Sequence, residues 1–175
     1  MNIPQPWYAL RVRPRRERVV ADSLHCKGYD VFLALHRQRR RWSDRVAEVE
    51  LPLFPGYVFA RFDVQRRLPI LKTPGVMFVV GIGHVPAPID DAEIDALQIL
   101  IKSQLELQPW PFLRIGQRVR IVGGPLNDAE GILTAVKKRN RLVVSITLLQ
   151  RSVAVEVDQD CAWPLDPSAV QLKAS

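Results

Sequence analysis

The hydrophobic pattern of this sequence changes its period near residue 108, and this change constrains the fold more than any other feature. Before that point, segments with an apolar residue every three or four positions alternate with segments in which every second residue is apolar. After it, only the period of two recurs, in several short runs. A period of two is typical of strands, and a period near 3.6 of helices. The sequence therefore predicts an α+β domain over residues 1–107 and a small all-β domain over 114–175, joined by a linker over 108–113.

The first domain is predicted to be an α+β sandwich, in which helices cover a face of one antiparallel or mixed sheet. The expected strands cover residues 7–13, 29–35, 56–62 and 76–80, the last of them buried, and a β-hairpin arm covers 37–53. A first helix begins at Pro14, because proline lacks the N–H that a first helical turn leaves unused. Asp90 and Glu93 form a capping-box-like pair that predicts a second helix. Its apolar stripe consists of Ile94, Leu97, Ile101 and Leu105.

The second domain is predicted to be a small barrel, because short alternating strands are separated by turn residues. The alternating positions are Val119 and Ile121, then Ile132, Thr134 and Val136, then Leu142, Val144, Ile146 and Leu148, and finally Val153, Val155 and Val157. The β propensity of residues 143–147 and 153–157 is high. We therefore expect this barrel, and not a helical hairpin, in the free protein.

The net charge of +7 is concentrated in one part of the chain. Residues 11–45 contain eleven Lys and Arg against four Asp and Glu, whereas the other 140 residues contain fourteen of each sign. A concentrated positive field favours a phosphate backbone or an acidic protein surface as partner. The alternative is a charge that serves only solubility.

Several functional classes lack support in the sequence. No run of 18 apolar residues is present, so we expect no membrane partner, and without a secretory signal or CxxC spacing we expect a reduced, cytoplasmic location. The histidines lie in different predicted elements, at His25, His36 and His84. With no P-loop, GxSxG or paired-carboxylate pattern, the sequence predicts no enzyme, no metal site and no cofactor.

Four stretches resemble the NusG family of transcription factors. WY at 7–8 before a basic helix, FPGYVF at 54–59 and PAPI at 86–89 resemble its amino-terminal (NGN) domain. RVRIVGGPL at 118–126, with Gly131 seven residues after Gly124, resembles its KOW motif, an SH3-like barrel. Because these stretches occur in family order over nearly the whole chain, the resemblance implies a monomeric factor that binds RNA polymerase across its cleft and suppresses pausing and termination.

The resemblance also implies a polymerase-binding surface. Pro55-Gly56 provides a tight turn into a strand, and the aromatic residues around it are Phe54, Tyr57 and Phe59. Family members bind the clamp helices of polymerase through this region, although aromatic residues in such a strand can equally be core. Arg66 and Arg67 lie where specialised relatives contact the opposite side of the cleft, but this chain lacks the threonine-rich motif of some of those relatives.

The arginines near the amino terminus are candidates for binding nucleic acid. Arg11 and Arg13 share one face of the first predicted strand, and Arg15 and Arg16 follow at a helix start, where the helix dipole disfavours cations. This conflict indicates a role other than folding. By resemblance, the same face lies near the non-template DNA strand, where arginines contact phosphates. The hairpin-arm arginines, Arg37, Arg39, Arg40, Arg41 and Arg45, are either solvated or contact nucleic acid or polymerase.

The barrel carries two further candidate sites. The KOW turn consists of Gly123, Gly124 and Pro125, with Gly131 permitting a bulge or close approach, and these residues either shape the barrel alone or also serve a partner. General NusG proteins bind Rho or a small-subunit ribosomal protein through a Phe-Gly-Arg element. The matching residues here are Leu149, Gln150 and Arg151, which lack the aromatic anchor.

This departure separates two versions of the function. RWSDR at 41–45 and TPGV at 73–76 resemble UpxY-type paralogues, which act as antiterminators at long operons for surface polysaccharides. We favour that specialised class over a housekeeping NusG that couples polymerase to Rho or the ribosome. An alternative function, from a different class of protein, is that of a ribosome-associated RNA-binding KOW protein.

Overall fold

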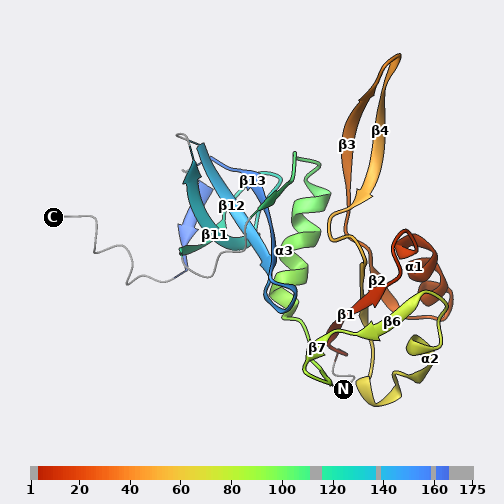
Figure 1. Ribbon diagram of the computed structural model, residues 1–175. Helices are drawn as coiled ribbons and strands as arrows, with labels where there is room; N and C mark the ends of the chain where they lie inside the picture. Colours follow the sequence, from red (N-terminus) through yellow and green to blue (C-terminus); the bar gives the residue numbers. More distant parts are fainter. Residues whose placement is uncertain (1–3, 111–115, 137–138, 159–160, 166–175) are drawn as a thin grey trace. The chain divides into compact units, whose positions relative to one another are not determined.

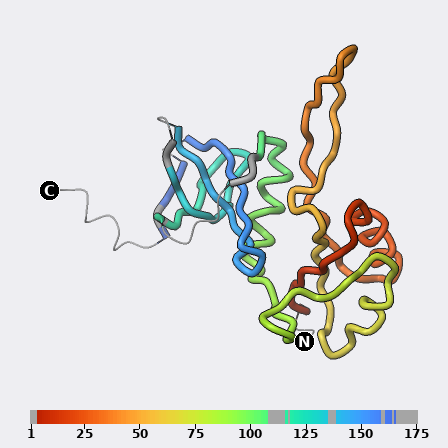
Figure 2. Tube along the Cα trace, viewed as in Figure 1, coloured from red at the N-terminus to blue at the C-terminus, as the bar shows by residue number. Residues whose placement is uncertain are grey.

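The chain forms two compact units, Met1–Asp91 and Ala92–Ser175. The computed structural model describes residues 4–110, 116–136, 139–158 and 161–165. The first unit is α+β, and the second combines a helix with a six-stranded antiparallel sheet (Figure 1). This arrangement confirms the predicted fold class, an α+β region followed by a small β barrel. The chain trace in Figure 2 follows the same order of elements.

A four-stranded antiparallel sheet in the order β2-β5-β1-β6 forms the centre of the first unit. Its strands are β1 (Trp7–Val12), β2 (Asp30–Phe32), β5 (Tyr57–Arg61) and β6 (Val76–Val79). A hairpin of β3 (Leu35–Trp42) and β4 (Arg45–Pro52) projects beyond this sheet (Figure 1). The other elements are α1 (Glu17–Cys26), η1 (Val64–Arg66), α2 (Leu68–Leu71), β7 (Gly81–Ile82) and β8 (Val85–Pro86). The predicted strands, first helix and hairpin are confirmed, mostly with shorter bounds.

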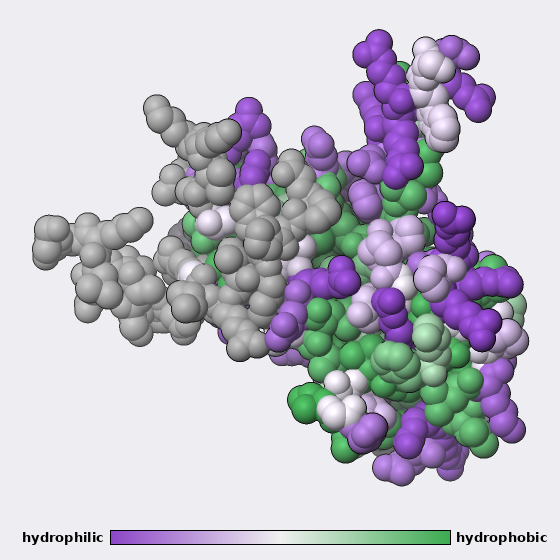
Figure 3. All heavy atoms as spheres, in the orientation of Figure 1, coloured by the Kyte–Doolittle hydropathy of each residue, from purple (hydrophilic) through white to green (hydrophobic). Residues whose placement is uncertain are grey.

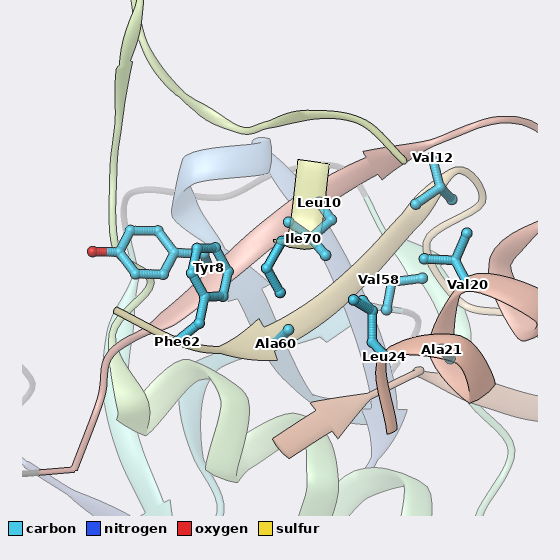
Figure 4. Packing of buried hydrophobic residues seen from close by; sticks show 10 residues of the cluster. All are labelled: Tyr8, Leu10, Val12, Val20, Ala21, Leu24, Val58, Ala60, Phe62 and Ile70. Carbon is cyan, nitrogen blue, oxygen red and sulfur yellow. The ribbon is translucent and has the colours of Figure 1, made fainter. Parts of the chain in front are cut away.

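The apolar core of the first unit lies between one face of this sheet and the helices α1 and α2. Alternation along β5 turns Val58 and Ala60 toward the helices, and the stripe of α1 residues meets them. The members of this core are Tyr8, Leu10, Val12, Val20, Ala21, Leu24, Val58, Ala60, Phe62 and Ile70 (Figure 4). Burial of these side chains fixes α1 on the sheet.

Strand β6 is less buried than its sequence predicts. Met77 and Phe78 are 53% and 51% exposed, because β6 is an edge strand of the sheet, with only β1 as a neighbour. A short apolar run does not distinguish an edge strand from a central one, so the prediction of a buried strand over 76–80 is wrong.

Helix α3 (Asp91–Lys102) ends earlier than its apolar stripe predicts. Ile94 and Leu97 are fully buried, but Leu105 lies beyond the helix and is 41% exposed. Gln104 adopts a left-handed conformation with φ of 57°, which an α-helix does not accommodate. The helix falls in the second unit because the division between the units lies at Asp91, whereas the sequence predicts a boundary at residue 107. The predicted domain limits remain a proposal.

The second unit contains a sheet in the order β14-β10-β11-β12-β13-β9, curled into the predicted barrel (Figure 1). Its strands are β9 (Gln108–Trp110), β10 (Gln117–Ile121), β11 (Glu130–Val136), β12 (Arg139–Ile146), β13 (Arg151–Glu156) and β14 (Ala162–Pro164), with a short turn η2 (Thr147–Leu149). Leu133 pairs with Leu142, and Ile132 pairs with Val143. Ile132 and Thr134 therefore lie on the face opposite to Leu142.

The predicted linker is partly wrong. Residues 108–110 form β9, which pairs with β13, for example Pro109 opposite Val153. The proline is tolerated there because β9 is an edge strand, where a missing N–H breaks no ladder on the open side. Residues 111–113 of the predicted linker lie outside the described residues. In the described part of the chain, no helix combines the length and the apolar character that spanning a bilayer requires.

The core predicts a clear difference between two apolar residues of α1. Leu24 is fully buried, whereas Val19 is 48% exposed. Leu24→Ala should lower the free energy of unfolding by about 2–5 kcal/mol, because it removes buried methyl groups and leaves a cavity. Val19→Ala should change it by less than about 0.5 kcal/mol. Urea denaturation of both variants measures the difference, and equal effects would contradict the described packing.

Candidate functional site

The turn before β5 is held by hydrogen bonds on both sides of Gly56. The Gly56 N–H donates to the Glu17 carboxylate over 2.8 Å, and the Gly56 carbonyl accepts from the Val12 N–H over 2.9 Å. The Tyr57 N–H donates to the Phe54 carbonyl over 3.2 Å, closing the turn. Gly56 has a φ of 83°, a left-handed conformation that favours glycine. The turn is therefore fixed to both α1 and β1.

Arg11 lies against this turn. It pairs with Tyr57 across β1 and β5, and its guanidinium lies 4.9 Å from the centre of the Tyr57 ring. A Cβ at Gly56 would meet the same guanidinium, which would then have to move from its present position. The sequence predicts that Arg11 binds nucleic acid. In the structure its guanidinium makes a cation–π contact with Tyr57.

The aromatic side chains around the Gly56 turn differ in how much of each is exposed to solvent. Phe59 and Phe54 are buried, with their ring centroids 6.0 Å apart in an edge-to-face arrangement. Phe59 also stacks on Phe32 at 5.9 Å. Of the three aromatic residues predicted to bind polymerase, only Tyr57 is part-exposed. In this structure Phe54 and Phe59 are core residues, and Phe59 lies on the same face of β5 as Tyr57.

Phe78 is a residue of this face that sequence reasoning missed. Arg11 pairs with Tyr57 on one side and with Phe78 on the other, so the three side chains form a row across β5, β1 and β6. Phe78 is 51% exposed. Simple alternation would place Phe78 on the same face as Val76, but the register shift separates them. Val76 pairs with Val12 and packs against the core, whereas Phe78 pairs with Arg11 at the open edge of the sheet.

The other predicted nucleic-acid-binding residues lie at the start of α1. Arg13, Arg15 and Arg16 are exposed, and among the described residues none of them forms an ion pair. Arg15 has a φ of 63°, and the N-cap residue Arg16 makes no side-chain capping bond. The acid that does favour a helix start is Glu17, which is turned inward to the Gly56 N–H. The arginines are consequently left with their charge facing solvent.

Arg66 and Arg67 lie at the far end of β5 from Tyr57, so the structure does not bring the five predicted polymerase-binding residues together. Arg66 forms a loose ion pair with Asp63 at 3.9 Å and is 89% exposed. Arg67 donates to the Val64 carbonyl over 3.0 Å. Both contacts are local, and they leave Arg66 accessible.

The predicted KOW turn shapes the barrel in two ways. Gly123 and Gly124 have φ of 86° and 69°, and the Gly123 N–H donates to the Asn127 side-chain oxygen over 2.7 Å. Gly131 has no such φ; a Cβ there would clash with the Val143 carbonyl of the neighbouring strand. With Pro125, the two turn glycines line a hollow of about 500 Å³. The close approach predicted for Gly131 is thus what the structure shows.

Leu149, Gln150 and Arg151 form the connection between β12 and β13. Gln150 is exposed and left-handed, with a φ of 51°, a conformation that the glycine of a Phe-Gly-Arg element would adopt with less strain. The preceding Thr147 is bound by Glu93 of α3, whose carboxylate accepts from the Thr147 N–H over 3.1 Å and from its hydroxyl. Among the described residues, no group of three or more His, Cys, Asp and Glu could hold a metal ion.

The Glu17 contact predicts a specific pattern of stability. Glu17→Ala should lower the free energy of unfolding by about 1–3 kcal/mol, because it leaves the buried Gly56 N–H without an acceptor. Glu17→Gln should have a smaller effect, since the amide oxygen can still accept the bond. Urea denaturation tests both variants. Equal losses in the two would show that the hydrogen bond to Gly56 is not the stabilising contact.

Comparison with known proteins places this fold in a family. Residues 5–98 match the family model described as "Transcription termination factor nusG". The chain is 34% identical over 174 residues to the transcription termination/antitermination protein NusG of Escherichia coli K12, and 32% identical over 173 residues to that of Borreliella burgdorferi. These alignments cover 87% of this chain and 92% and 94% of the relatives.

A solved structure of NusG from Thermotoga maritima has a similar fold, with a TM-score of 0.52 at 20% identity. The match covers 93% of this chain and 98% of that one. Taken with the family model and the sequence relatives, this similarity extends over both units of the chain. The chain belongs to the NusG family.

Proposed function

We propose that this chain is a transcription elongation and antitermination factor that binds RNA polymerase across its cleft and suppresses pausing and termination. The relatives with about one third identical residues are named transcription termination/antitermination proteins. The observation that carries the proposal is the row of Tyr57, Arg11 and Phe78 on one sheet face. It combines accessible aromatic surface with a cation, as protein-docking surfaces commonly do.

The row is held rigidly before any partner binds. Gly56 is bonded to Glu17 and Val12, and Arg11 lies on the Tyr57 ring. Phe54, whose carbonyl accepts from the Tyr57 N–H, is itself buried and packs edge-to-face against Phe59. A surface that needs little ordering loses less conformational entropy on binding. It is therefore suited to docking on a helical, largely apolar element such as the clamp helices of polymerase.

The effect on transcription requires no chemical step. A factor that binds the closed, active form of polymerase more tightly than the open, paused form shifts the population toward the active one. In this proposal Tyr57 and Phe78 dock on one side of the cleft and Arg66 and Arg67 contact the other. The unpaired cations Arg13, Arg15 and Arg16 lie along the non-template DNA strand and contact its phosphates.

We further propose that the chain is a specialised antiterminator of the UpxY type and not a housekeeping NusG. The support is at the connection of Leu149, Gln150 and Arg151, where no aromatic side chain is present to anchor Rho or a ribosomal protein. The left-handed Gln150 shows that the backbone of this connection keeps a conformation suited to glycine. The target operons would be long ones, such as clusters for surface polysaccharides.

The docking surface predicts different effects for two neighbouring residues of β6. Phe78→Ala should weaken binding to core RNA polymerase by about tenfold or more, as expected for an aromatic anchor. Tyr57→Ala should act in the same direction. Met77→Ala is the matched control, because Met77 is equally exposed but lies at a register shift, pairs with no residue of β1 and so is not part of the row.

The measurement combines affinity for core polymerase with the dwell time at a defined pause in reconstituted elongation. Phe78→Ala should lose both binding and pause suppression, whereas Met77→Ala should retain both. Equal effects of the two substitutions would refute the proposed face. If the unchanged protein affected neither pausing nor termination, the elongation function itself would be refuted.

The specialised class is tested at the β12–β13 connection. The unchanged chain should bind Rho and the small-subunit ribosomal protein weakly. The double change Leu149→Phe with Gln150→Gly, which recreates Phe-Gly-Arg, should strengthen that binding by about fivefold or more. Leu148→Phe provides a control that adds an aromatic ring one residue away. Tight binding by the unchanged chain would instead support the housekeeping function.

A further inference from the structure

The two faces of the projecting hairpin β3–β4 differ in charge balance. Residues that pair across the hairpin share a face. On one face Arg37 pairs with Glu50 and Arg39 with Glu48, with N–O distances of 3.7 and 3.5 Å. Arg18 of α1 also binds Glu50 over 2.7 Å, and its hydrogen bond and charge, with help from Arg37, lower the pKa of that carboxyl. Of the three arginines that β3 places on this face, Arg37 and Arg39 therefore lie opposite carboxylates, whereas Arg41 lies opposite Val46.

The opposite face carries cations and an aromatic ring without a balancing carboxylate. Its members on β3 are His36, Gln38, Arg40 and Trp42, and opposite them on β4 are Leu51, Val49, Ala47 and Arg45. In the described part of the chain, neither Arg40 nor Arg45 forms an ion pair, and Asp44 in the turn binds neither of them. The Trp42 side chain is 60% exposed. In Figure 3 the hairpin is a mostly hydrophilic projection.

We propose that this face, made by Gln38, Arg40, Trp42 and Arg45, is a binding site for an unpaired nucleic-acid strand. The two guanidinium groups bind successive phosphates, and a base stacks on the exposed Trp42 ring. Cations beside an aromatic platform are the combination with which proteins hold single strands without reading sequence. Because the contacts are to phosphate and base, the site does not depend on the sugar.

The geometry of the hairpin fits such a strand. Alternate residues of β3 lie about 6.8 Å apart along one face, which is comparable to the separation of successive phosphates in an extended single strand. Gln38, Arg40 and Trp42 occupy three such consecutive positions. The residues opposite the first two, Val49 and Ala47, are small and uncharged, so a backbone can approach closely. A duplex keeps its bases stacked inside and offers no base plane to Trp42, except at its ends.

The site is separate from the surface proposed to dock on polymerase. It lies on β3 and β4, whereas Tyr57 and Phe78 lie on β5 and β6 of the four-stranded sheet. It also differs from the cluster of Arg13, Arg15 and Arg16 at the start of α1. A binding assay without polymerase therefore tests it independently of the proposed elongation function.

The hairpin offers a matched pair of substitutions. Arg40 and Arg41 are adjacent, exposed and without an ion pair among the described residues, but they lie on opposite faces. Arg40→Ala and Arg41→Ala therefore remove the same charge from nearly the same place. Arg45→Ala, Trp42→Ala and Trp42→Phe complete the set. Circular dichroism and urea denaturation of the full chain check that every variant is folded.

Affinity is measured by fluorescence anisotropy of labelled single-stranded DNA, single-stranded RNA of the same length, and a blunt DNA duplex, over a series of salt concentrations. Arg40→Ala should reduce the slope of log K against log salt by about 0.7, the value for one phosphate contact on a single strand. Arg41→Ala should leave that slope unchanged. Trp42→Ala should weaken binding roughly 5- to 100-fold, the range for loss of one stacked base, with partial recovery in Trp42→Phe.

Three results would overturn the proposal. Equal effects of Arg40→Ala and Arg41→Ala would mean that net charge, and not this face, determines binding. Tighter binding of the duplex than of the single strands would exclude an unpaired occupant. A preference of about tenfold or more for DNA over RNA, or the reverse, would exclude a site that contacts only phosphate and base. Comparable affinity for the two single strands, lost with Arg40 and Trp42, would support it.

Discussion

The first unit depends on the contacts of a single residue without a side chain. Gly56 gives its N–H to Glu17 and its carbonyl to Val12, and it leaves the space in which Arg11 lies. A side chain at this position would strain a left-handed backbone and displace the guanidinium from the Tyr57 ring. The turn therefore connects the helix start, the central strand and the proposed docking surface. Gly56 thus contacts both the buried Glu17 and the surface residue Arg11.

The two faces of the sheet in the first unit differ in what covers them. Strand alternation turns Val58 and Ala60 to the helices and Tyr57 and Phe59 to the other side. On that second side, burial is graded from Phe59, which is fully covered, to Phe78, which is half exposed. The single strand β5 therefore contributes both a buried and a part-exposed aromatic residue to this face.

The arginines of the chain differ in what surrounds them, although they contribute equally to its net charge. Arg37 and Arg39 are paired with glutamates across the hairpin, and Arg11 lies on a tyrosine ring. Arg40 and Arg45, on the other hairpin face, have no such partner within the described residues. Only charges without a local partner remain fully available to an anionic ligand, because forming a new ion pair then requires no existing one to break. The basic segment is therefore several distinct surfaces.

Most elements could be predicted from periodicity and turn residues, because both depend on local backbone geometry. The hairpin arm, the first helix and the barrel strands were found in this way. The errors share a different cause. The apolar stripe predicts a last helix that continues to Leu105, but the left-handed Gln104 lies before that residue and the helix ends at Lys102. The sequence predicts a linker where β9 forms, because Pro109 and Pro111 remove hydrogen-bond donors and stiffen the chain. In both cases a tertiary or single-residue constraint overrode the average pattern.

The sequence by itself determined the fold class, the family and the segment of concentrated charge, since these follow from the order of residue types along the chain. The tertiary structure alone decided which residues are accessible. Sheet order placed β6 at an edge and exposed Phe78, while Phe59 is buried and packs against Phe32 and Phe54. Cross-strand pairing decided that Arg39 lies opposite a carboxylate, Glu48, whereas Arg40 lies opposite Ala47. Exposure and charge pairing depend on neighbours that are distant in sequence, and no local pattern specifies them.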